Sequence, residues 1–197
     1  MYRAATWLVL DSGVDTAQPD LVTKLIAGAE FQIGTDPSGP TFAVGGVDVT
    51  AAIREPRISA AVSTVATNLD VRRLLIGRQR EIIAGSRPGI VVEGRDITTV
   101  VAPDAQVRVL LVADPQARIA RRKSELGGAV GDAEVHDQVI RRDRDDSTVA
   151  QFHDAAPGVE VVDSTELTLD QVVDRIDALI DRVLRVESGD RVGQSGA

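Results

Sequence analysis

A glycine, an arginine and an aspartate follow directly after the apolar run IVVE, at Gly94, Arg95 and Asp96. The run is continuously apolar up to its last residue, which is typical of a strand in a parallel sheet covered on both faces. In an open parallel sheet, ligands bind at the carboxyl ends of the strands. An arginine and an aspartate at such an end can hold an anion and a polar ring edge together. Taken alone, the same two residues could form a surface ion pair at a strand exit.

The sequence after this point predicts alternating strands and helices. Residues 107–113 (VRVLLVA) and 159–164 (VEVVDS) are further apolar runs expected to be strands. Between them, Asp114 is a plausible N-cap for a helix whose first residue is a proline. A charged helix is expected over residues 132–147. A capping-box pattern that begins at Thr168 opens the last helix.

The first half of the chain has a different pattern. The segment MYRAATWLVLDSG reads as a helix closed by Gly13, and a second helix is expected over residues 20–29. EFQIG, a DPSG turn and TFAVGG then predict a β-hairpin. Residues 56–85 show helical spacing in two parts, which we expect to separate near Asn68.

Composition limits the class of protein. The 197 residues, 43% hydrophobic and 26% charged, fit one compact α/β domain with a small insertion. A net charge of −8 argues against a nucleic-acid polymer as partner. The absence of cysteine excludes disulfides and thiolate metal sites. Without a signal-peptide pattern or a long apolar run, the sequence predicts a cytoplasmic protein with no membrane partner.

A longer stretch around Arg95, VVEGRDITTVVAPDAQVRVLL, is similar to the pattern (A/V)-(D/E)-G-R-D-x-G-T-V-V-x-P-D-A of the bacterial cytidylate kinase family. Other segments agree in the same order. MYRA is similar to the end of D-[ST]-G-x-x-Y-R, and VGGVDVTAAIREPRISAAVSTVA resembles G-x-D-V-(T/S)-x-x-I-R…V-S-x-(V/A)-A. RRDRDDST resembles R-R-D-x-x-D-S-T-R, and VVDSTELTLDQVV the closing strand and helix. The resemblance covers roughly residues 1–183.

This resemblance implies a fold and a division of the chain. The fold is an α/β, P-loop nucleoside monophosphate kinase-like parallel sheet with helices on both faces and a small insertion that binds the nucleoside monophosphate. The expected parts are core helices over 1–29, a CMP-binding subdomain over 30–85, a core over 86–186 with lid helices at about 118–150, and a disordered tail or linker over 187–197.

The resemblance also implies which residues hold the acceptor. Arg3 and Arg95 match the family's arginines that grip the phosphate of CMP. Ser63, Arg72 and Asp96 match the residues that read the cytosine ring. Cytosine presents an amino donor beside ring-nitrogen and carbonyl acceptors, so its reader needs hydrogen-bond groups of both kinds.

Further matches lie in the second half. Arg142 and Asp146 match the pair that holds the ribose, and their spacing of four puts them on one helical face. Arg118, Arg121 and Arg122 fall where the family uses arginines near the ATP phosphates. For Arg118 and Arg122, a solvated charged face of the helix explains the pattern equally well.

The implied activity is transfer of the γ-phosphate of ATP to CMP or dCMP, with Mg²⁺, giving ADP and the nucleoside diphosphate. Such transfer depends mainly on positioning and charge neutralisation. The acceptor is a phosphate oxygen that is already ionised, so the reaction needs neither a protein nucleophile nor a strong general base. The expected partners are the two nucleotides, no metal ligand is assigned to the protein, and a monomer is expected.

The sequence departs from the family pattern in three places. It contains no G-x-x-x-x-G-K-[ST] motif, whose backbone N–H groups and lysine cradle ATP, so we expect a chain that is N-terminally truncated or inactive as written. Thr98 stands where the family has glycine, and Val149 where it has a phosphate-binding arginine. Two alternatives stay open: a catalytically inactive CMP-binding or regulatory module, and a kinase of another small acceptor.

Overall fold

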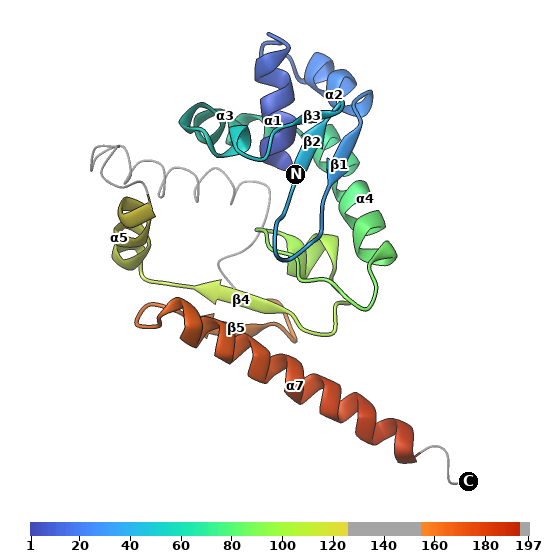
Figure 1. The fold of residues 1–197 in the computed structure, drawn as a ribbon, viewed down its shortest axis with the longest axis vertical. Helices are drawn as coiled ribbons and strands as arrows, with labels where there is room; N and C mark the ends of the chain where they lie inside the picture. The colour runs from blue at the N-terminus through green and yellow to red at the C-terminus, as the bar shows by residue number, and fades with distance from the viewer. Residues whose placement is uncertain (126–154, 194–197) are drawn as a thin grey trace. The chain divides into compact units, whose positions relative to one another are not determined.

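The computed structural model describes residues 1–125 and 155–193 (Figure 1). These residues form two compact units. Residues 1–93 make the first unit, and residues 94–125 together with 155–193 make the second. The first unit is helical with a small antiparallel sheet, and the second is built on a parallel pair of strands.

Helix α1 (Tyr2–Asp11) contributes to both hydrophobic cores of the first unit. Ala4 and Ala5 are each fully buried. Successive residues of a helix point about 100° apart, so these two side chains enter different cores. The helix ends as predicted, with Gly13 at a φ of 69°, the left-handed conformation that glycine adopts readily.

The two cores join segments that are far apart in the sequence. One core links α1, α2 (Pro19–Ala27), α3 (Pro56–Ala66) and α4 (Leu69–Gly85). Its buried residues are Ala5, Val9, Val22, Ile26, Val65, Val71 and Leu75. The other links α1 and α3 with the sheet and the short 3-10 helix η1 (Ala52–Arg54). Its buried residues are Ala4, Trp7, Val44, Val49, Ile53 and Ile58. The segment 1–29 thus packs with 30–85 in one unit.

The hairpin is present as predicted and carries one more strand. β1 (Phe31–Ile33) pairs antiparallel with β2 (Phe42–Val44), and β2 pairs with β3 (Val47–Asp48). Gly45 and Gly46 both have positive φ, 57° and 80°, which suits the tight two-residue turn between β2 and β3. The sequence analysis did not predict β3.

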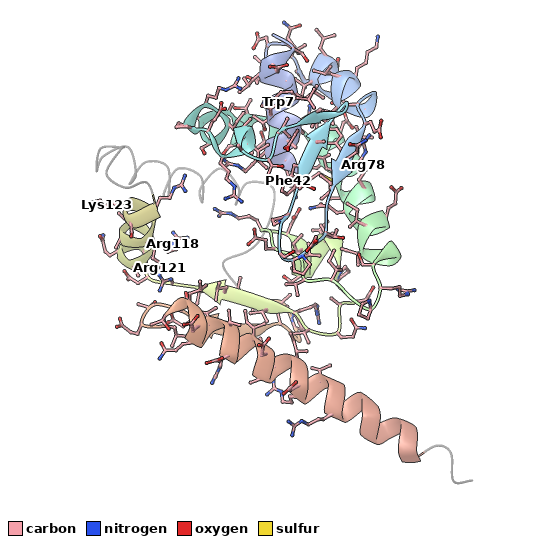
Figure 2. All side chains as sticks on the ribbon, viewed as in Figure 1. Trp7, Phe42, Arg78, Arg118, Arg121 and Lys123 are labelled. Carbon is pink, nitrogen blue, oxygen red and sulfur yellow. The ribbon has the colours of Figure 1, made fainter. Side chains whose placement is uncertain are left out.

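Asn68 separates α3 from α4, as predicted. Its side-chain oxygen accepts from the N–H groups of Asp70 and Val71, at 3.0 and 3.3 Å, and so caps the second helix. Farther along α4, the Arg78 guanidinium lies 4.8 Å from the centre of the Phe31 ring and donates to the Ala29 carbonyl at 3.0 Å (Figure 2). These contacts fix α4 against the start of the hairpin.

In the second unit, β4 (Val109–Val112) and β5 (Glu160–Asp163) pair in parallel, confirming two predicted strands. Asp114 caps α5 (Pro115–Glu125) by accepting from the Gln116 N–H at 2.8 Å. The predicted capping box opens α7 (Leu169–Gly193). Thr168 N–H donates to the Gln171 side chain at 2.9 Å, and Gln171 N–H donates back to the Thr168 hydroxyl at 3.3 Å.

One predicted strand is wrong. Residues 90–93 are irregular, Val91 is 87% exposed, and the parallel sheet of the described residues has two strands instead of the expected three. A β-strand is stable only when its backbone N–H and C=O groups find a ladder partner, and no described strand pairs with this segment. Apolar composition alone therefore predicted the wrong conformation here.

The expected tail also needs correction. α7 continues to Gly193, so the first part of the segment 187–197 is helical. A helix that has already formed gains one hydrogen bond with each added residue, and no proline interrupts it here. The helix expected over 132–147 lies outside the described residues. None of the helices in 1–125 and 155–193 combines the length and apolar character needed to cross a bilayer.

Candidate functional site

Arg3 lies in the first turn of α1, and two other elements hold its guanidinium. The Arg3 Nε donates to the carbonyl of Ile53 in η1, and one terminal nitrogen donates to the Ser59 hydroxyl of α3 at 3.0 Å. The Ser59 hydroxyl in turn lies 3.5 Å from the carbonyl of Glu55, to which it can donate. Arg3 is half-buried where α1, η1 and α3 meet.

Two of the predicted cytosine-reading residues, Ser63 and Arg72, belong to the first unit and lie on α3 and α4. Ser63 is 7% exposed and stands one helical turn after Ser59, so both hydroxyls are on the same face of α3. Arg72, in the first turn of α4, donates to the Ala66 carbonyl at 3.4 Å. Its guanidinium also lies 5.9 Å from the centre of the Tyr2 ring. Tyr2, the residue before Arg3 in α1, thus contacts Arg72.

Arg95 and Asp96 belong to the second unit. Asp96 is 4% exposed, and its carbonyl accepts from the N–H groups of Val100 and Val101, at 2.9 and 3.2 Å. These bonds open η2 (Ile97–Val101), a short π-helix that the sequence analysis did not predict. Since residues 90–93 form no strand, this turn and not a strand end fixes the pair.

Glycine is needed just before this turn. A Cβ at Gly94 would stand 2.9 Å from Cγ1 of Ile97, a side chain that is itself 9% exposed. Such a contact forces the isoleucine to move. Thr98, at the position where the related pattern has glycine, is half-buried inside the π-helix.

Helix α5 carries three arginines, of which Figure 2 labels Arg118 and Arg121. Arg121 donates to the Ser164 hydroxyl at 3.1 Å and to the carbonyls of Ser164, Thr165 and Leu167. These acceptors belong to the turn between β5 and α7, so packing within the second unit accounts for this arginine. Arg118 and Arg122 lie on the same helix, both partly exposed.

The structure therefore places the predicted residues in two sets. Arg3, Ser63 and Arg72 belong to the first unit, and Arg95 and Asp96 to the second. The convergence of the two sets on one cleft stays a prediction. Another set, Arg142, Asp146 and Val149, lies outside the described residues. Sequence reasoning missed Ser59; its only signal is the spacing of four from Ser63.

Few titratable groups in the described part of the chain have a shifted pKa. Burial lowers the pKa of the Met1 amino group, and the nearby charge of Arg3 lowers it further, while Glu93 opposes this. Hydrogen bonds from the side chain and backbone of Thr165 lower the pKa of Asp163. Within residues 1–125 and 155–193, no group of three or more His, Asp or Glu side chains is arranged to hold a metal ion.

Comparison with known proteins shows which family the chain belongs to. The family model described as Cytidylate kinase matches residues 1–182. The chain is 51% identical over 186 residues to a Cytidylate kinase of Cutibacterium acnes, an alignment that covers 94% of this chain and 83% of the relative. It is 41% identical over 182 residues to a Cytidylate kinase of Streptomyces griseus, covering 91% and 78%. A Cytidylate kinase of Mycobacterium avium is 41% identical over 187 residues, covering 91% and 80%. The chain belongs to the cytidylate kinase family.

Proposed function

We propose that this chain carries the CMP or dCMP site of a kinase that transfers the γ-phosphate of ATP to the nucleotide's phosphate. The observation that carries the proposal is the placement of Arg3. It comes from the one segment that resembles the family's Y-R motif, and η1 and α3 hold its guanidinium in a fixed plane. A guanidinium fork held in this way suits a phosphate, with which arginine forms paired, charge-assisted hydrogen bonds.

The base is read by residues of both units in this proposal. Ser63 and Asp96 are buried, at 7% and 4% exposure, so a ring that contacts them is removed from water. Inside such a site a hydrogen bond discriminates strongly, because a wrong base leaves a buried polar group unpaired. Asp96 accepts from the cytosine amino group, and Arg72 donates to its acceptors. UMP presents a carbonyl where CMP presents the amino group, and therefore binds more weakly.

Arg142 and Asp146 hold the ribose, and Arg95 joins Arg3 at the phosphate. No side chain has to abstract a proton, since the attacking phosphate oxygen is ionised. The protein lowers the barrier by aligning this oxygen and by spreading the transferred charge over arginines. We assign Arg118 and Arg122 of α5 to the donor side on the resemblance alone. Arg121 is held by the turn after β5.

Mg²⁺ supplies neutralisation of the ATP phosphates in this chemistry. Proteins bind it through one or two carboxylates together with substrate phosphates and water, rather than in an all-protein cage. The described residues have no carboxylate cluster that could hold the ion. We therefore assign it to the nucleotide and to none of the residues 1–125 and 155–193.

Calorimetric titration tests the acceptor site. We expect the protein to bind CMP at least tenfold more tightly than UMP, and Asp96→Ala to lose most of this preference, since a hydrogen bond to a charged group contributes about 1.5–3 kcal/mol. Asp104→Ala is the matched control, an exposed aspartate of the same unit. Equal affinity for the two nucleotides in the unmodified protein would refute the proposal.

A second candidate is a CMP-binding module without kinase activity. It is favoured by the absence of a G-x-x-x-x-G-K-[ST] motif from these 197 residues. An assay of the purified 197-residue chain with ATP, Mg²⁺ and CMP tests this second candidate. We expect CMP binding without CDP formation from this polypeptide. Turnover above that of an Arg3→Met and Asp96→Ala double variant, prepared identically, would exclude the inactive module.

A further inference from the structure

We infer that Ser59 is a positioning residue for the nucleotide's phosphate: it orients Arg3 and so sets how much the phosphate adds to affinity. This inference rests on the proposed function, and it concerns a residue that the motifs do not single out. Arg3, Ser59, Ile53 and Glu55 all belong to the first unit, so their contacts are internal to one compact body.

Two hydrogen bonds orient the guanidinium of Arg3. Nε donates to the Ile53 carbonyl and a terminal nitrogen donates to the Ser59 hydroxyl at 3.0 Å. Arginine is a rigid planar fork, so two bonds at its side edge fix the plane and the direction of its far end. A phosphate meets the fork at that far end. Without Ser59, the guanidinium loses one of these two bonds, and its plane is held less firmly toward the ligand.

The Ser59 hydroxyl is oriented so that its oxygen can accept a hydrogen bond from Arg3. The Ser59 hydroxyl donates a hydrogen bond to the carbonyl of Glu55, the residue before α3, at 3.5 Å. The lone pairs of the oxygen are then directed to Arg3. Serine thus acts as an acceptor here, a role that threonine can keep and alanine cannot.

Ser59 lies on the same face of α3 as a predicted base-reading residue. Ser59 and Ser63 are separated by four residues, which places them on one face of the helix and about 6 Å apart along its axis. Ser63 is the proposed reader of the base. One face of α3 therefore presents the phosphate-orienting hydroxyl and the base-reading hydroxyl in succession.

Titrations with CMP and with cytidine, which lacks the phosphate, test the inference. We expect Ser59→Ala to weaken CMP binding about five- to tenfold and to change cytidine binding less than twofold, because only the phosphate contact depends on Arg3. We expect Ser59→Thr to keep the CMP affinity of the unmodified protein. Thr64→Ala, an exposed position of the same helix, leaves both affinities unchanged.

A double-mutant cycle supplies the decisive comparison. In an Arg3→Met background, Ser59→Ala should cause no further loss of CMP affinity. Equal losses for CMP and cytidine would show that Ser59 only stabilises α3, and no loss for either ligand would show that Arg3 is oriented without it; each result overturns the inference. If the unmodified protein binds CMP no better than cytidine, the proposed function itself fails and the inference fails with it.

Discussion

Arg121 and Ser164 are joined by two hydrogen bonds, one to the serine hydroxyl and one to its carbonyl. Ser164 is 3% exposed, and its own hydroxyl donates to the Val112 carbonyl at 3.0 Å. The pair therefore connects α5 to the ends of both parallel strands. This contact explains why Arg121 is present without reference to ATP, the ligand to which the resemblance assigns it.

Replacing this arginine should destabilise the second unit. We expect Arg121→Met to lower the free energy of unfolding by about 1 kcal/mol, at the low end for a charged hydrogen-bond donor because the residue is exposed. Urea denaturation followed by circular dichroism measures the loss. Arg175→Met, an exposed change on α7, is the control. A stability equal to that of the unmodified protein would contradict the role given to Arg121.

Asp163 should respond to the loss of its threonine partner. The Thr165 hydroxyl and N–H donate to this carboxylate at 2.6 and 2.9 Å and hold its pKa below the usual value. Thr165→Val removes the hydroxyl, so we expect the pKa of Asp163 to rise in an NMR titration. Ser38→Ala, which removes the same kind of bond from Asp36, should leave Asp163 unchanged.

The same change has a predicted pH dependence. A carboxyl with a depressed pKa in the folded state stabilises the protein above its unfolded pKa of about 3.9, and this contribution is lost as the pH falls through the folded pKa. The stability difference between the unmodified protein and Thr165→Val should therefore shrink as the medium is acidified below about pH 4. A difference that grows on acidification would contradict this assignment.

Val149→Arg should strengthen CMP binding. The resemblance places a phosphate-binding arginine at this position, and one more charge-assisted contact is worth about tenfold in affinity. The gain should shrink as salt rises, because added ions screen the interaction. Calorimetry at two salt concentrations measures both effects, with Val149→Gln as the uncharged control. An equal gain from glutamine would show that charge is not the cause.

Local signals predicted most of the elements. The caps at Asn68, Asp114 and Thr168 are present because each depends on a side chain and a backbone N–H only two or three residues away. The hairpin turn residues also act locally. The mixed α/β class with a parallel strand pair is confirmed, and so is membership in the cytidylate kinase family.

The wrongly predicted strand and the overlooked serine share a physical cause. Residues 90–93 have the composition of a buried strand, but a strand depends on a pairing partner that can come from anywhere in the chain. Ser59 was missed for a similar reason, since its partner Arg3 is distant in sequence. Motif matching assigned Arg121 to a ligand but could not show that the protein itself holds this arginine through the turn after β5.

The central claim is that residues of both units bind one CMP molecule. It is tested most directly by titrating isotope-labelled protein with CMP and following the amide resonances of Ser63, Arg72 and Asp96. We predict that all three move along one saturation curve with a common dissociation constant, and that UMP at the same concentrations leaves Asp96 nearly unmoved. Saturation of Ser63 and Arg72 with no response at Asp96, or separate curves for the two units, would contradict the account.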